Sequence, residues 1–192
     1  DIVVWGATGF TGKLVAEYIA KNAPAGLRWA IGGRDAAKLE RVRRELPASA
    51  SSVPIVVHDA GSREAMTALA LSTRVVCTTV GPYAKYGYPL ASACAKNGTD
   101  YCDLTGEPPF MAKVIRACHD DAKKSGARVV HACGFDSIPS DLGVLLTAER
   151  AAADGTGELG QTVNYVRKLR GGFSGGTIDS MRTQAIEMRA SA

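Results

Sequence analysis

The sequence predicts an α/β fold, a Rossmann-type doubly wound parallel sheet followed by the beginning of a second, α+β domain. Short apolar runs alternate with segments of helical periodicity over residues 2–153, which is typical of a parallel sheet covered on both faces. The first two apolar runs end in glycines. The helical pattern breaks at the glycines of residues 154–157, so we divide the chain into residues 1–150, the Rossmann domain, and residues 151–192, the start of the second domain.

Each element follows from its own residues. Strands are expected in the apolar runs at residues 2–5, 27–31, 54–58, 75–80, 99–104 and 128–133. Helices are expected where apolar residues recur at helical spacing, at residues 10–22, 36–46, after Ser62, and at residues 89–96, 109–125 and 139–153. Ser62 can cap its helix, and Pro139 suits a first turn because its missing N–H costs nothing there. Residues 162–169 alternate like a strand of another sheet, and flexible glycines follow at 171, 172, 175 and 176.

Composition restricts the class of protein. With 46% hydrophobic and 22% charged residues, the chain resembles an ordinary soluble globular protein. The net charge of +4 is dispersed, which argues against nucleic-acid binding. An odd number of cysteines without a CxxC pair indicates reduced thiols, and the three histidines are scattered, so no metal site is expected. No signal peptide or long apolar span appears, so we expect a cytoplasmic protein.

The two ends of the sequence suggest part of a longer protein. No initiating methionine precedes the first strand, and the chain stops inside a helical pattern without a cap. Peripheral membrane association through residues outside this sequence therefore stays open.

A glycine-rich loop carries the strongest functional signal. Residues 6–12 read GATGFTG, between the first strand and the first helix. Glycines let the backbone turn sharply and approach a pyrophosphate, which then sits over the helix N-terminus, where N–H groups have no partner. The alternative is a purely structural turn. The residues expected to hold a dinucleotide here are Gly6, Thr8, Gly9, Phe10, Thr11 and Gly12.

The end of the second strand indicates which dinucleotide is bound. NAD-binding domains place an acid there, whereas this chain has Gly33 followed by Arg34. A guanidinium suits a 2′-phosphate, so NADP(H) is the expected cofactor; the alternative is a solvated arginine. Asp35 comes one residue late and can instead cap the next helix. Two further loops follow strand ends, and they contribute Asp59 near the adenine and Thr79, Val80, Gly81 and Pro82 near the nicotinamide ribose.

With these motifs the chain resembles the saccharopine dehydrogenase-like oxidoreductases, most closely their trans-acting enoyl reductase branch. The residues responsible are 6–12, 32–34, 78–83 with 86–87, 98–101 with 103–107, and 133–141. The resemblance implies an amino-terminal NADP-binding domain and a carboxyl-terminal domain for substrate and dimer contacts, so residues 151–192 would begin a substrate or dimerisation domain. It also implies a polyketide-derived acyl substrate of glycolipid synthesis, handed over by a partner polyketide synthase, and a homodimer.

Catalytic candidates must lie near the nicotinamide. Tyr83 and Asp136 are the expected proton sources, although Tyr83 could instead pack against the ribose and Asp136 could cap a helix. Glu107, Phe135 and Ser137 are expected to contact substrate. Glu107 could instead favour the start of the next helix, and Ser137 could cap a helix. None of the six tyrosines has a lysine four residues later, which disfavours short-chain reductase chemistry.

Three functions remain open. The first is an NADPH-dependent reductase of an enoyl or related acyl substrate. The second is saccharopine-type chemistry on an amino-acid imine, whose carboxylates need an arginine cluster that this sequence does not show. The third is a non-catalytic NADP(H)-binding redox sensor.

Overall fold

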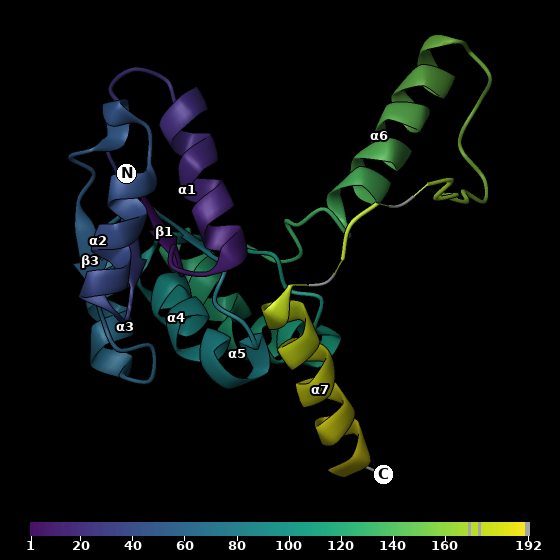
Figure 1. Ribbon diagram of the computed structural model, residues 1–192. Coiled ribbons are helices and arrows are strands. Elements are labelled where there is room, and N and C mark those ends of the chain that lie inside the picture. Colours follow the sequence, from purple (N-terminus) through teal and green to yellow (C-terminus); the bar gives the residue numbers. More distant parts are fainter. Residues whose placement is uncertain (169, 173, 191–192) are drawn as a thin grey trace.

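The computed structural model of the chain describes residues 1–168, 170–172 and 174–190, with only the backbone described at 187, 188 and 190. Its parallel sheet has six strands in the order β3-β2-β1-β4-β5-β6. The strands are β1 (Ile2–Trp5), β2 (Trp29–Gly33), β3 (Ile55–Val57), β4 (Val75–Thr78), β5 (Asp100–Asp103) and β6 (Val129–Val130). The expected doubly wound Rossmann architecture is thereby confirmed (Figure 1).

Helices alternate with the strands along the chain. They are α1 (Phe10–Asn22), α2 (Ala36–Glu45), α3 (Arg63–Leu71), α4 (Tyr83–Asn97), α5 (Pro108–Ser125), α6 (Ile138–Ala153) and α7 (Gly175–Ala190), with a short 3-10 turn, η1 (Ala48–Ala50). Ser62 caps α3 as expected, because its hydroxyl accepts a hydrogen bond from the Ala65 N–H. None of the described helices combines the length and apolar character needed to cross a bilayer.

Two apolar cores lie on opposite faces of the sheet. One joins β1 and β2 to α1 and α2 through Val4, Ile31, Ala16 and Leu39, all fully buried. The other joins the central strands to α3, α4 and α5, with Val76, Met66, Leu90 and Val114 among its members. Rigid packing on both faces fixes the strand ends, where the loops that matter for function begin.

Helix α4 begins six residues before the position expected from sequence. The helical pattern in the sequence predicts a start at Pro89, but Pro89 lies inside the helix. The reason is a cap supplied from far along the chain: the Glu107 carboxylate accepts hydrogen bonds from the N–H groups of Tyr83 and Ala84. Local sequence carries no trace of a cap 23 residues away, so the expected start was wrong.

Strand β6 is shorter than expected and ends at Val130 rather than 133. The N–H groups of Ala132 and Cys133 bond to the side chain and the carbonyl of Asp103 instead of continuing the ladder. Ala132 adopts φ 58°, which turns the chain out of the sheet.

The last forty residues differ most from the sequence expectation. Residues 162–168 pair with no strand among those described, and Leu169 lies outside the described residues, so the expected strand of a second sheet is not observed. The glycines at 175 and 176 open α7 rather than a flexible linker, because the Ser174 hydroxyl accepts the Thr177 N–H. Helix α6 buries no residue and extends away from the sheet, at the upper right in Figure 1. The division at residue 150 stays a prediction.

Candidate functional site

A cleft of about 710 Å³ lies at the carboxyl ends of the strands, the edge where open α/β sheets bind ligands. Trp5 and Gly33, the last residues of β1 and β2, line it, and the loops after β3, β4, β5 and β6 contribute further lining residues. The opposite wall comes from the first turns of α7, at Ser174, Gly175, Gly176, Thr177, Ser180, Met181 and Gln184. Besides α7, the lining residues not expected from sequence are Trp5, Ala60, Leu104 and Gly106. No local pattern in the sequence shows that α7 returns to this edge.

The glycine loop forms one end of the cleft. Gly6 adopts φ 94°, and a Cβ on Gly12 would lie 2.7 Å from the Gly6 carbonyl carbon and 2.8 Å from the Thr79 hydroxyl. Both positions therefore require glycine, one for its conformation and one for its lack of a side chain. No side chain caps α1 at Gly9, so the N–H groups of its first turn, at residues 10–12, have no side-chain partner, and these residues line the cleft. This is the arrangement that binds a diphosphate.

Arg34, the residue predicted to bind the 2′-phosphate, follows the neighbouring strand β2. Arg34 lines the cleft directly after β2, is exposed, and makes no ion pair with any residue that the structure describes. Asp35 does not compete for a ribose, because its Oδ1 accepts the Lys38 N–H at 2.9 Å and caps α2. The guanidinium is thus free for an anionic group bound in the cleft.

The loop after β4 packs directly on the glycine loop. The Thr79 hydroxyl lies 3.3 Å from the Gly6 carbonyl oxygen and donates to it, and a Cβ on Gly6 would lie 2.7 Å from the Val80 Cγ2. Gly81 also lines the cleft, whereas Pro82 does not. Asp59 lies outside the cleft as well: it is exposed, and its Oδ1 accepts the Gly61 N–H at 2.9 Å.

Tyr83 lines the cleft, but its hydroxyl is engaged inside the protein. The side chain is buried, the hydroxyl donates to the Thr78 carbonyl at 3.2 Å, and it accepts from the Leu104 N–H at 3.5 Å. Burial, reinforced by the nearby Asp103 carboxylate, raises the pKa of Tyr83 well above its ordinary value. The hydroxyl is thus already engaged, which disfavours Tyr83 as a proton source; its packing against the ribose stays a prediction.

Glu107 also lines the cleft, and it is almost completely buried. Its two carboxylate oxygens accept the N–H groups of Tyr83 at 2.9 Å and Ala84 at 2.8 Å. The carboxylate therefore caps α4, not the helix α5 that follows it, in which it makes no side-chain cap bond. An anionic cap at a helix N-terminus is favoured by the helix dipole.

The loop after β6 contributes Phe135 and Asp136 to the cleft, and both side chains are exposed. Phe135 keeps 79% of its surface accessible. Ser137 does not line the cleft; it occupies the N-cap position of α6 without making a side-chain cap bond. The structure thus brings together Tyr83, Glu107, Phe135 and Asp136, but not Ser137.

Two further polar residues lie beneath the cleft. Asp103 ends β5 and is 2% exposed, and its carboxylate lies 2.7 Å from the Nδ1 of His131. The ring of His131 packs edge-on against Tyr101 and Phe110. Asp103 was missed because a buried acid at a strand end leaves no pattern in sequence. Among the described residues, no group of His, Cys, Asp and Glu could hold a metal ion.

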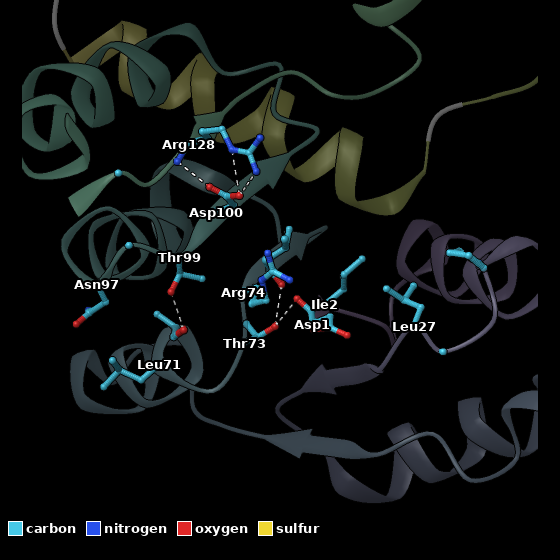
Figure 2. A pocket seen from close by; sticks show the side chains of 16 residues that line it. Asp1, Ile2, Leu27, Leu71, Thr73, Arg74, Asn97, Thr99, Asp100 and Arg128 are labelled. Atoms are coloured by element: carbon cyan, nitrogen blue, oxygen red, sulfur yellow. Dashed lines mark hydrogen bonds and ion pairs between the residues drawn. The ribbon is translucent and has the colours of Figure 1, made fainter. Parts of the chain in front are cut away.

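A second groove, of about 890 Å³, lies at the opposite, amino edge of the sheet. Figure 2 shows Arg128 turned onto Asp100, with the Arg128 Nε 3.1 Å from the carboxylate. Because Arg128 is paired with Asp100 and the groove lies at the edge away from the glycine loop, we assign no ligand to it.

Known proteins with similar sequences also contain an NADP-binding domain. The family model of the saccharopine dehydrogenase NADP binding domain matches residues 2–130. A Mycobacterium tuberculosis protein provisionally named a trans-acting enoyl reductase is 53% identical over 181 residues, covering 94% of this chain and 43% of that protein. A trans-acting enoyl reductase of Mycobacterium bovis is 45% identical over 195 residues, covering 99% and 46%. The chain thus spans less than half the length of these curated relatives.

Among solved structures, the apo saccharopine dehydrogenase (L-Glu forming) of Saccharomyces cerevisiae superposes with a TM-score of 0.64 at 17% identity. The match covers 80% of this chain and 32% of the yeast enzyme. At that identity the likeness shows a shared fold.

Proposed function

Because the chain belongs to the family of saccharopine dehydrogenase NADP binding domains, we propose that its cleft binds NADP(H) and that the protein is an NADPH-dependent enoyl reductase. The observation that carries the proposal is the uncapped first turn of α1, together with Gly6 and Gly12, two positions in the adjoining loop that require glycine. Arg34 stands one strand away with its charge free. This is a combined site for a diphosphate and a 2′-phosphate.

The proposed placement of the cofactor uses the residues predicted from sequence that also line the cleft. The diphosphate lies over residues 8–12, the 2′-phosphate beside Arg34, and the nicotinamide ribose against residues 79–81. Asp59 and Pro82 do not line the cleft. The predicted contacts of Asp59 with the adenine and of Pro82 with the nicotinamide ribose stay predictions.

The substrate proposal rests on the relatives' names and on the charge of the cleft. Arg34 is the only cationic side chain among the lining residues that the structure describes, and it lies at the cofactor end. A substrate with several carboxylates, as in saccharopine-type chemistry, would find no cation at the other end. Leu104, Phe135 and Met181 offer apolar surface there, which suits an acyl chain.

For catalysis, bound NADPH would supply the hydride to the alkene. The neighbouring carbon needs a proton. Glu107 has its oxygens engaged in capping α4, and the Tyr83 hydroxyl donates internally. Asp136 lines the cleft and reaches solvent, so we assign to it the delivery of the proton from water.

We also propose a location and partners for the enzyme. A cytoplasmic enzyme that receives a carrier-bound acyl chain from a polyketide synthase fits the name of the relatives, trans-acting enoyl reductase. A homodimer built through residues beyond the Rossmann domain is part of the same proposal.

The test is a fluorescence titration of the whole protein with NADPH and NADH, followed by NADPH oxidation with enoyl thioesters. We expect tighter binding of NADPH, turnover with acyl thioesters, and at least a tenfold loss of kcat in Asp136→Asn. Ser137→Ala, next in the chain but outside the cleft, is the matched control and should retain full activity. Binding without turnover on any acyl substrate would support the redox sensor instead.

A further inference from the structure

Asp103 is the most heavily bonded side chain beneath the cleft. Its Oδ2 accepts the hydroxyl of Tyr101 at 2.8 Å and lies 2.7 Å from Nδ1 of His131. Its Oδ1 accepts the N–H groups of Thr105 at 3.1 Å and Ala132 at 3.2 Å. A carboxylate accepts and never donates when ionised, so the proton of the His131 ring sits on Nδ1 in this arrangement. Four donors from three segments thus converge on one buried group.

Two of these segments are loops that line the cleft. Thr105 belongs to the loop after β5, in which its hydroxyl also accepts the Glu107 N–H at 3.1 Å. His131 and Ala132 begin the loop after β6, which carries Phe135 and Asp136 into the cleft three to four residues later. The Asp103 carboxylate is therefore the point at which the two loops are joined.

Ala132 is held in a conformation that it would not adopt freely. Its φ of 58° is positive, which no other described residue except glycine shows. Asp103 bonds both sides of this position: its Oδ1 accepts the Ala132 N–H, and its backbone carbonyl accepts the Cys133 N–H at 2.7 Å. A strained residue persists where the surrounding structure over-determines it, and such residues cluster at functional sites.

We infer that Asp103 is a positioning residue for the reaction, because its carboxylate holds Ala132 in the left-handed conformation that directs residues 133–136 into the substrate end of the cleft. Asp103 does not touch substrate or cofactor in this role; it acts through Asp136 and Phe135. The inference deepens the proposed function and rests on it for its kinetic consequences. The loops proposed to hold the cofactor, residues 6–12, 33–34 and 79–81, make no hydrogen bond to Asp103.

The test variant is Asp103→Asn in the whole protein. The amide keeps the size of the side chain but replaces one acceptor oxygen by a donor, so it cannot satisfy all four donors at once. The matched control is Asp100→Asn, at the other end of the same strand, where the carboxylate pairs with Arg128 at the protein surface.

Hydrogen exchange gives a readout that does not depend on activity. In Asp103→Asn we expect amides of residues 131–137 to exchange at least tenfold faster, while residues 6–12 exchange as in the wild type. In turnover we expect the dissociation constant for NADPH to stay within twofold and kcat with an enoyl thioester to fall at least tenfold. Asp100→Asn should change neither.

A second substitution tests the route through Ala132. Glycine adopts positive φ without strain, so Ala132→Gly should be nearly neutral alone but recover at least threefold in kcat when combined with Asp103→Asn. If Asp103→Asn does not fold, Tyr101→Phe removes one of the four donors and keeps the ring; it should show smaller changes in the same direction.

Several outcomes would overturn the inference. One is unchanged hydrogen exchange at residues 131–137 in Asp103→Asn, and another is an equal loss of NADPH binding and of turnover in that variant. A third is a change in kcat in the double variant that equals the sum of the separate effects of Asp103→Asn and Ala132→Gly. The fourth is a Tyr101→Phe variant that changes neither exchange nor turnover. A wild-type protein that turns over no enoyl thioester would refute the proposed function, whereas the exchange experiment would still decide whether Asp103 holds the loop.

Discussion

Replacing Arg34 by alanine removes the only cation in the described lining of the cleft, so it tests cofactor selection directly. A hydrogen bond to a charged group contributes about 1.5–3 kcal/mol. Arg34 is exposed, and water and salt screen exposed charges, so we expect the lower end of that range. About 1.5 kcal/mol corresponds to a roughly tenfold weaker dissociation constant for NADPH.

The assay is a fluorescence titration of wild type and Arg34→Ala with NADPH and NADH at two salt concentrations. Binding of NADH, which lacks the 2′-phosphate, should change less than twofold, and the NADPH difference should shrink at high salt because the contact is exposed. Arg41→Ala serves as the control, since Arg41 is also an exposed arginine but lies outside the cleft. Equal losses for both nucleotides, or an equal effect of Arg41→Ala, would refute this assignment.

Three further predictions concern the scaffold of the site. Gly12→Ala places a Cβ 2.7 Å from the carbonyl carbon of the first loop glycine, so it should destabilise the fold by about 1–3 kcal/mol in urea unfolding and weaken NADPH binding. Gly143→Ala, inside α6 with nothing within 4 Å, should leave NADPH binding unchanged and raise stability by about 0.5–1 kcal/mol, because alanine favours a helix over glycine. Glu107→Ala leaves two buried N–H groups at the start of α4 unpaired and should cost about 1–3 kcal/mol, with Glu107→Gln less harmful because one acceptor remains; equal unfolding free energies for the two variants would contradict the capping role. Burial raises the pKa of Cys94 to about 12, and because the thiolate is the reactive form, Cys94 should resist iodoacetamide at pH 8 in the native protein. Desolvation also raises the pKa of Cys133, but its side chain is exposed, so Cys133 should react first; mass spectrometry showing earlier modification of Cys94 would contradict its burial.

Local signals in the sequence were enough for much of the fold. The bounds of α1 agree with the sequence expectation at both ends, because the glycine loop marks its start and the amphipathic pattern its length. The parallel pattern of the strands also placed their carboxyl ends at one edge, which is why most of the expected cofactor residues do meet in one cleft. These are features that neighbouring residues determine.

Interactions between distant residues were not predictable in the same way. The start of α4 depends on a carboxylate supplied by the loop after β5, and the end of β6 depends on Asp103. The α7 wall of the cleft depends on how the chain returns after α6. In each case the deciding partner lies more than twenty residues away, and the sequence carries no periodicity that reports it.

The central claim is that one nucleotide with a 2′-phosphate lies across the carboxyl edge of the sheet. A crystal structure of the protein with NADPH tests it most directly. We predict a diphosphate within hydrogen-bond distance of the N–H groups of residues 10–12 and a 2′-phosphate beside the Arg34 guanidinium. A nucleotide bound in the groove at the amino edge, or a carboxyl-edge cleft filled by the protein's own side chains, would contradict it.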